Sequence, residues 1–141
     1  MIKWYIGDIL KTDAELIAVP VNLKGTLGKG LAKQVRDQFP GSLESYRNLL
    51  SEGYLGIGRV CIDPPFLWFP TKKDWRDPSE LDWVIAGLRD TVIQCNLFRI
   101  TSAAIPKLGC GLGGLKWEDV RKQIILYLDK PKTEFQIYGE P

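Results

Sequence analysis

The segment PKLGCGLGGLKW, residues 106–117, decides the class of fold that this chain adopts. Glycine occupies four of the six positions from 109 to 114. An apolar, strand-like run precedes the segment at residues 101–105, and a helical pattern follows at residues 117–128. Glycine allows sharp turns and lets backbone N–H groups approach a ligand closely. A glycine loop that leads into a helix predicts an anion site, because unpaired N–H groups and the helix dipole point at the same place.

A second run of glycines lies earlier in the chain, at Gly25, Gly28 and Gly30, and it also precedes a helical pattern. Two loops of this kind favour one ligand with a diphosphate between two sugars. The spacing of apolar residues predicts strands at residues 2–6, 16–21, 58–62, 66–69, 101–105 and 135–138. It predicts helices at residues 29–39, 43–50, 81–92 and 117–128. Ser79 and Asp82 resemble a capping box for the third helix.

Strands that alternate with helices predict an α/β fold, a sheet covered by helices on both faces. The 141 residues fit one domain, residues 1–141. Hydrophobic residues make up 45% and charged residues 26%, the composition of a soluble globular protein. With no leader-like segment and no apolar run of about 18 residues, we expect a cytoplasmic monomer without membrane contact. The net charge of +2 does not by itself indicate nucleic acid.

The chain has no histidine and three cysteines without metal-like spacing. The absence of histidine excludes Ser-His-Asp and Cys-His catalysis, and we expect neither a metal nor a cofactor. The cysteines are interpreted as free thiols. Acid–base chemistry would then fall to carboxylates, lysine, tyrosine or water.

The glycines at 109, 111 and 114 also match the dinucleotide pattern G-x-G-x-x-G. Only 27 residues follow Gly114, enough for one helix and one strand. A dinucleotide-binding half-domain needs more parallel strands after its fingerprint. A phosphate-binding loop of another α/β fold is the preferred interpretation, with a ligand-free glycine turn as the alternative.

Four segments resemble the macro domain, an ADP-ribose-binding α/β/α module with a mixed central sheet. They are residues 7–10 (GDIL), 21–30 (VNLKGTLGKG), 69–76 (FPTKKDWR) and 108–115 (LGCGLGGL). The last two resemble the DarG-type DNA ADP-ribosyl glycohydrolases and, less closely, the terminal ADP-ribose protein glycohydrolases. The protein glycohydrolases carry a catalytic aspartate in the phosphate loop, where this chain has Gly113, as the DarG type does. The resemblance therefore favours a mechanism centred on lysine.

The resemblance implies roles for individual residues. Asp8 would accept a hydrogen bond from adenine, with the backbone of Ile9 nearby, and Asn22 would bind the distal ribose. The alternatives are a cap or turn carboxylate for Asp8 and a turn amide for Asn22. Cys110 is interpreted as a packing residue within the phosphate loop. The remaining ligand-binding positions are Gly28, Gly30, Thr71, Gly109, Cys110, Gly111, Leu112, Gly113 and Gly114, with the amides of residues 109–115 holding the diphosphate.

Lys72 is the catalytic candidate. Near C1″ of the distal ribose, its amine could donate a hydrogen bond or proton as the glycosidic bond breaks, or attack the opened sugar aldehyde. The alternative is a solvated pair of loop lysines, Lys72 and Lys73. Trp75, Arg76 and Lys73 are candidates for contact with ADP-ribosylated single-stranded DNA, through base stacking and phosphate contacts. Trp68 and Phe69 are expected in the core.

Three functions remain open. The first is an antitoxin-like hydrolase that removes ADP-ribose from thymidine-linked nucleic acid. The second is a hydrolase of another ADP-ribose ester on protein, or of ADP-ribose 1″-phosphate. The third is a reader that binds ADP-ribose without turnover. Lys72 favours an enzyme over a reader, and residues 69–76 favour DNA over protein.

Overall fold

The computed structural model describes all 141 residues and contains a six-stranded sheet in the order β1-β6-β5-β2-β4-β3. The strands are β1 (Ile2–Tyr5), β2 (Leu16–Val21), β3 (Cys61–Asp63), β4 (Phe66–Pro70), β5 (Ser102–Ile105) and β6 (Glu134–Tyr138). Neighbouring strands are parallel except for β3, which pairs with β4 in the antiparallel direction. The predicted mixed sheet is confirmed.

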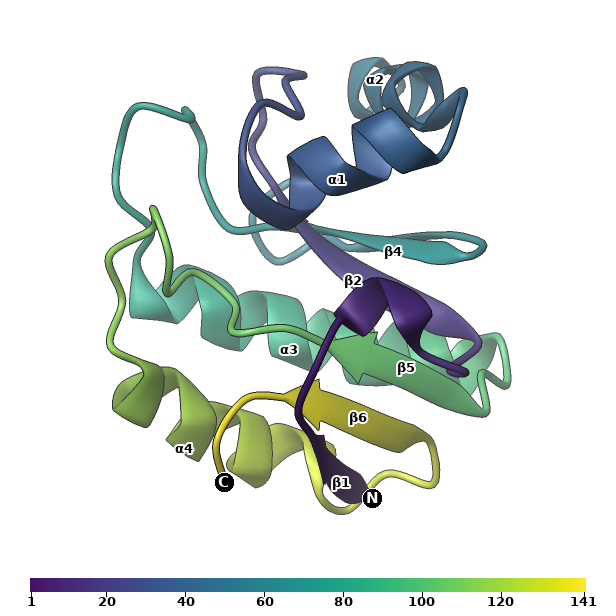
Figure 1. Ribbon diagram of the computed structural model, residues 1–141, viewed down its shortest axis with the longest axis vertical. Helices are drawn as coiled ribbons and strands as arrows, with labels where there is room; N and C mark the ends of the chain where they lie inside the picture. The colour runs from purple at the N-terminus through teal and green to yellow at the C-terminus, as the bar shows by residue number, and fades with distance from the viewer.

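Four α-helices cover the sheet on both faces, as expected (Figure 1). Helices α1 (Gly30–Gln38) and α2 (Ser42–Ser51) lie on one face, and α3 (Leu81–Leu97) and α4 (Trp117–Leu128) lie on the other. This gives the three-layer α/β/α arrangement. None of the helices combines the length and the apolar composition needed to cross a membrane.

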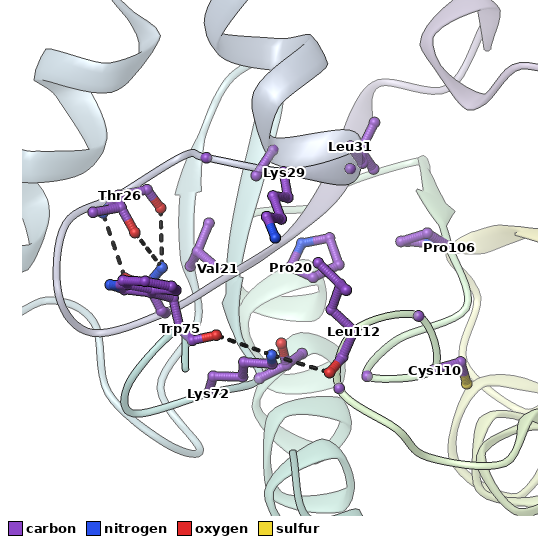
Figure 2. A pocket seen from close by; sticks show the side chains of 18 of the residues that line it. Pro20, Val21, Thr26, Lys29, Leu31, Lys72, Trp75, Pro106, Cys110 and Leu112 are labelled. Carbon is purple, nitrogen blue, oxygen red and sulfur yellow. Dashed lines mark hydrogen bonds between the residues drawn. The ribbon is translucent and has the colours of Figure 1, made fainter. Parts of the chain in front are cut away.

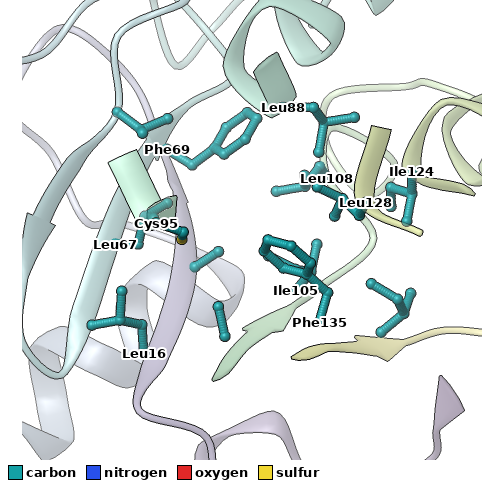
Figure 3. Close-up of a cluster of buried hydrophobic side chains, with 14 of the residues drawn as sticks. Leu16, Leu67, Phe69, Leu88, Cys95, Ile105, Leu108, Ile124, Leu128 and Phe135 are labelled. Atoms are coloured by element: carbon teal, nitrogen blue, oxygen red, sulfur yellow. The ribbon is translucent and has the colours of Figure 1, made fainter. Parts of the chain in front are cut away.

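The side chains of each central strand point alternately to the two faces, and so build two cores. In β4, Leu67 and Phe69 join the larger cluster under α3 and α4 (Figure 3), while Phe66 and Trp68 join the cluster under α1 and α2. Trp68 and Phe69 are fully buried, which confirms their expected place in the core. Each such side chain contributes about 1.5–3 kcal/mol through burial.

Close packing between a helix and the sheet depends on Gly87 of α3. A Cβ at this position would lie 2.3 Å from the ring of Phe69. The missing side chain lets the helix rest directly on the aromatic ring, so Gly87 is required for contact rather than for backbone freedom.

Several local expectations were wrong. The strand predicted at residues 58–62 begins only at Cys61, as the short β3, and is preceded by a turn with an isolated bridge between Gly56 and Arg59. A 3-10 helix at Ile9–Lys11 was not expected. The N-cap of α3 is Glu80, without a side-chain hydrogen bond, so Ser79 and Asp82 form no capping box. Ser79 instead packs against the glycine loop of residues 109–113.

The strand order brings three loops to one edge of the sheet. Because β5, β2 and β4 are adjacent and parallel, the segments that follow them emerge side by side. The chain leaves β5 toward β6 on one side and leaves β2 toward β4 on the other. Ligands of α/β sheets bind at such a switch point, outside the carboxyl ends of the strands.

Candidate functional site

A cleft of about 990 Å³ lies at this switch point, between the segments that follow β2, β4 and β5 (Figure 2). Its volume is that of a site for a ligand of drug or nucleotide size. The structure brings most of the predicted site residues together here, although they come from three separate segments. Those that line the cleft are Asn22, Gly28, Gly30, Thr71, Lys72, Trp75, Arg76, Gly109, Cys110, Gly111, Leu112 and Gly113.

The phosphate loop of residues 109–113 turns through Gly109, whose φ is +73°. The amides of residues 109–115 are predicted to hold the diphosphate, and some of their N–H groups form hydrogen bonds within the chain. The N–H groups of Cys110, Gly114 and Leu115 donate to the carbonyl oxygens of Lys107, Gly111 and Gly109, at 3.2, 3.2 and 3.0 Å. The N–H groups of Gly111, Leu112 and Gly113 donate no hydrogen bond to another backbone group of the chain. These three consecutive donors line the cleft and suit an anion.

Gly113 cannot carry a side chain in this conformation. A Cβ there would lie 2.3 Å from the carbonyl oxygen of Gly109 and 2.5 Å from Oγ of Ser79. The N–H of Ser79 also donates to the carbonyl oxygen of Gly113 at 2.9 Å. The start of α3 therefore packs against the loop and excludes a carboxylate at position 113.

The second wall of the cleft is the N-terminus of α1. The helix begins at Gly30, and its N-cap residue, Lys29, makes no capping hydrogen bond through its side chain. The first-turn N–H groups of an α-helix have no partner within the helix. Residues 28–32 line the cleft, so this wall presents uncapped donors and the positive end of the helix dipole.

Asn22 shapes the first loop from within. Its Nδ2 donates to the carbonyl oxygen and the hydroxyl of Thr26, at 3.0 and 2.7 Å, and its Oδ1 accepts from the N–H of Lys24 at 2.8 Å. The hydroxyl of buried Tyr46 donates to the backbone oxygen of Asn22. Burial raises the pKa of Tyr46 to about 12. Asn22 thus acts as a turn amide in this structure, and its contact with a ribose remains a prediction.

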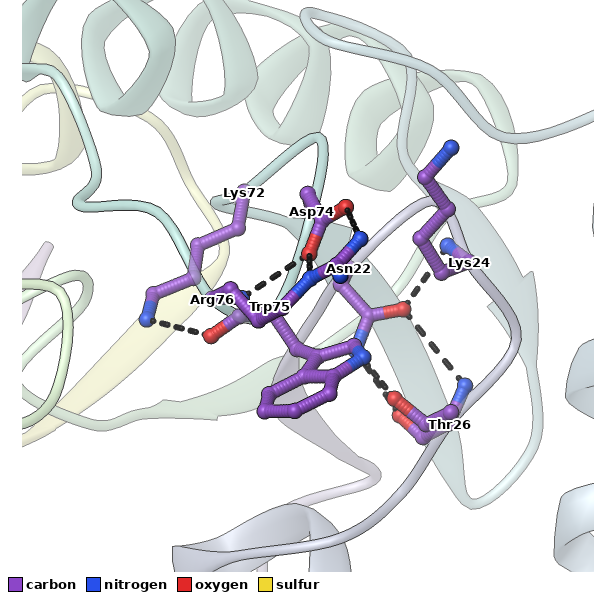
Figure 4. A network of polar contacts seen from close by, with 7 residues as sticks. All are labelled: Asn22, Lys24, Thr26, Lys72, Asp74, Trp75 and Arg76. Atoms are coloured by element: carbon purple, nitrogen blue, oxygen red, sulfur yellow. Dashed lines mark hydrogen bonds and ion pairs between the residues drawn. The ribbon is translucent and has the colours of Figure 1, made fainter.

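Lys72 reaches across the cleft from the segment after β4. Its Nζ donates to the carbonyl oxygen of Leu112 at 3.2 Å and to that of Trp75 at 3.3 Å (Figures 2 and 4). Neither acceptor is charged. Lys73, by contrast, does not line the cleft, and its Nζ lies 5.1 Å from the ring centre of Trp83. The side chains of the two adjacent lysines therefore lie in different places, and only that of Lys72 lines the cleft.

Trp75 and Arg76 form the outer rim of the cleft. The indole of Trp75 is 52% exposed, and the guanidinium of Arg76 lies 5.5 Å from its ring centre. Arg76 also pairs with Asp74 at 2.7 Å (Figure 4). Hydrogen bonds from Arg76 hold the pKa of the Asp74 carboxyl well below its usual range. The ion pair keeps the guanidinium beside the indole, which leaves an accessible aromatic surface.

Asp8 and Ile9 lie outside the cleft. Asp8 is the N-cap of the 3-10 helix, and its Oδ1 accepts from the N–H of Leu10 at 3.0 Å. Ile9 is buried in the core under α1 and α2. Asp8 lines a smaller hollow beside Tyr5 and Tyr138. The structure therefore gives Asp8 the cap role that was the alternative to adenine recognition, which remains a prediction.

Cys110 lies in the phosphate loop but packs against the larger core, and burial raises the pKa of its thiol. No disulfide forms, so the three cysteines are free, as expected. No group of three or more histidine, cysteine, aspartate or glutamate side chains is arranged to hold a metal ion.

Two cationic residues of the cleft were missed by the sequence interpretation, Lys29 and Lys107. Lys29 stands between two glycines of the first loop, and Lys107 immediately precedes the phosphate loop. Their positions within the two anion loops were the available signal. Lys107 is paired with Glu140 at 2.6 Å.

Two proteins named DNA ADP-ribosyl glycohydrolase are similar to this chain. The protein from Mycobacterium tuberculosis is 36% identical over 147 residues, which cover 98% of this chain and 42% of that protein. The protein from Thermus aquaticus is 36% identical over 132 residues, which cover 88% of this chain and 37% of that protein. The chain thus spans about two fifths of the length of these curated relatives.

Solved structures agree with the sequence relatives. The macrodomain of Mycobacterium tuberculosis DarG matches with a TM-score of 0.92 and 35% identity, covering 100% of this chain and 99% of that one. Thermosipho africanus DarTG in complex with ADP-ribose matches with a TM-score of 0.91 and 33% identity, covering 97% of this chain and 41% of that one. A family model described as the macro domain matches residues 18–124. The resemblance seen in the glycine loops is confirmed, and this chain belongs to the macro domain family.

Proposed function

We propose that this protein is a hydrolase that removes ADP-ribose from modified nucleic acid, with thymidine as the linked base. The relatives that are 36% identical are named DNA ADP-ribosyl glycohydrolases, and their similarity covers most of this chain. The reaction breaks the bond between C1″ of the distal ribose and the base, consumes one water, and yields ADP-ribose and the unmodified base.

The two glycine loops would hold the diphosphate of ADP-ribose. The consecutive free N–H groups of Gly111, Leu112 and Gly113 form one side of the cradle, and the first turn of α1 forms the other. A solved relative, Thermosipho africanus DarTG, is described in complex with ADP-ribose. Anion binding by backbone amides needs no charged side chain, which leaves the lysines of the cleft free for other contacts.

One observation carries the catalytic proposal: Lys72 reaches into a cleft that no carboxylate lines. Gly113 excludes the side chain that a carboxylate-dependent mechanism would need at this point of the loop. The amine of Lys72 would either donate a proton to the leaving base or attack the sugar aldehyde after ring opening. The first route uses the third N–H donor of the ammonium, because two already bond the carbonyl oxygens of Leu112 and Trp75. The second route requires the neutral amine, so the ammonium must first give a proton to water.

The rim of the cleft suits single-stranded DNA. The exposed indole of Trp75 offers a surface for base stacking, which contributes about 1–3 kcal/mol per base. Arg76 lies beside it and could contact a phosphate. An antitoxin-like role, a cytoplasmic location and a monomeric state remain predictions that accompany this function.

The test offers the protein three substrates in parallel: a single-stranded oligonucleotide with ADP-ribosylated thymidine, a protein with ADP-ribose on glutamate, and ADP-ribose 1″-phosphate. We expect release of ADP-ribose from the oligonucleotide, measured by chromatography. Release only from the protein or the 1″-phosphate would assign the chain to the other hydrolases. Tight calorimetric binding of ADP-ribose without any release would make the protein a reader.

A further inference from the structure

The charges that line the cleft are all of one sign. Its lining contains four cationic side chains, Lys29, Lys72, Arg76 and Lys107, and no aspartate or glutamate. The whole chain carries a net charge of only +2, so this concentration of positive charge is local. A cleft lined by one sign of charge raises the local concentration of an anionic ligand.

Three of the four cations are already engaged within the protein. Arg76 pairs with Asp74 at 2.7 Å, and Lys107 pairs with Glu140 at 2.6 Å. Lys72 donates to two carbonyl oxygens across the cleft. Lys29 is the exception, because it takes part in none of the five ion pairs of the chain and does not cap its helix.

The side chain of Lys29 adds a positive charge to a cleft whose other donors to an anion include backbone N–H groups. Its backbone belongs to the glycine loop at the start of α1, while its long side chain extends into the open space of the cleft (Figure 2). Under the proposed function, the amides of both loops hold the diphosphate of ADP-ribose. A further point charge on a flexible side chain is then available for a second phosphate of the same substrate.

We infer that Lys29 contacts a backbone phosphate of the nucleic-acid strand that carries the ADP-ribosylated base. This inference rests on the proposed function and names a specificity-determining residue for it. A protein substrate brings no such phosphate, and neither does an isolated nucleoside. Lys29 therefore makes the site prefer an oligonucleotide over the same linkage in a nucleoside.

The experiment compares Lys29→Gln with the wild type on two substrates that share the scissile bond: ADP-ribosylated thymidine in a single-stranded oligonucleotide, and the ADP-ribosylated nucleoside. We expect kcat/KM to fall about fivefold to tenfold on the oligonucleotide and to stay within about twofold on the nucleoside. The plot of log(kcat/KM) against log[salt] becomes shallower by about 0.7, the value for one phosphate contact on a single strand. Lys29→Arg restores most of the activity on the oligonucleotide.

Lys33→Gln is the matched control, since Lys33 lies one turn along the same helix, is exposed and does not line the cleft. It makes the same change in net charge, and we expect both substrates to be processed normally. An equal loss for Lys29→Gln and Lys33→Gln would reduce the effect to general electrostatics and overturn the inference.

Calorimetry with free ADP-ribose separates the remaining outcomes. A tenfold weaker Kd for Lys29→Gln would place Lys29 on the diphosphate, against the inference, and so would equal losses on the two substrates. No change on either substrate would also overturn it. If the wild type released ADP-ribose from neither substrate, the proposed function would be wrong. Fluorescence anisotropy with the intact ADP-ribosylated oligonucleotide would then still test whether Lys29→Gln weakens binding.

Discussion

Nζ of Lys72 donates a hydrogen bond to the carbonyl oxygen of Leu112 at 3.2 Å, which joins two segments 40 residues apart in the chain. One segment follows β4 and the other is the phosphate loop after β5. The contact holds the ammonium at the wall of the cleft with neutral acceptors only. Since no carboxylate competes for it, the amine can turn toward a bound substrate at modest cost.

Replacing Lys72 by alanine should abolish turnover and preserve binding of ADP-ribose. Loss of a general acid or nucleophile lowers kcat by about 10²–10⁴-fold. The backbone donors of both glycine loops remain in place, so calorimetry should give a Kd for ADP-ribose within a few-fold of the wild type. Lys73→Ala is the control, because the Lys73 ammonium lies over Trp83 outside the cleft. Full activity of Lys72→Ala would remove this lysine from the chemistry.

A side chain at position 113 should disrupt the phosphate loop. In Gly113→Ala the new methyl group would meet the carbonyl oxygen of Gly109 and the hydroxyl of Ser79, so the loop or the start of α3 must move. We expect binding of ADP-ribose to weaken about tenfold or more, measured by calorimetry. Gly56→Ala is the control, since Gly56 lies outside the cleft and its new methyl group would meet only the side chain of Arg59, at an ordinary 3.8 Å. Equal affinities of the two variants would contradict this account of the loop.

Tyr46 should make the free energy of unfolding depend on pH in the alkaline range. Its pKa rises from an ordinary value of 10.0 to about 12 in the folded protein, because the phenol is buried. Between these two pH values unfolding releases a proton from Tyr46. The contribution of Tyr46 to the free energy of unfolding is therefore complete below pH 10 and decreases as the pH rises toward 12. Denaturant titrations across this range should show the decrease.

Tyr46→Phe tests the same residue at neutral pH. The substitution removes the donor to the backbone oxygen of Asn22 and should lower the free energy of unfolding by about 1–3 kcal/mol. It should also flatten the alkaline decrease. Tyr54→Phe, at a position that is 54% exposed, serves as the control and should change neither. A steep alkaline decrease that persists in Tyr46→Phe would assign it to other groups.

Gly87→Ala should destabilise the fold although alanine favours helices. The intrinsic gain of about 1 kcal/mol opposes a methyl group placed 2.3 Å from the ring of Phe69. Overpacking of this kind costs about 1–3 kcal/mol or more, so urea denaturation should show a net loss. Asn96→Ala, at an exposed position of the same helix, should be neutral or slightly stabilising. A stabilised Gly87→Ala would mean that α3 does not rest on Phe69.

Much of the fold could be predicted because its signals are local. Continuous apolar runs in β2 and β4, and apolar residues three or four apart in α3 and α4, mark segments that must be buried. Some predictions of local structure were wrong, because a contact distant in sequence decided the outcome. Ser79 has the side chain of a helix cap, yet its hydroxyl lies against Gly113 and forms no hydrogen bond within the chain. Tertiary packing against the glycine loop replaced the cap.

The sequence by itself determined the α/β class and the two glycine loops, because hydrophobic periodicity and glycine act over a few residues. Only the tertiary structure decided which groups share the cleft. Lys72 and Lys73 are adjacent in the chain, yet one lines the cleft and the other lies over Trp83. Lys29 lies 43 positions before Lys72 and lines the same cleft. The physical reason is the parallel order of β5, β2 and β4, which gathers the segments at their carboxyl ends whatever their separation in sequence.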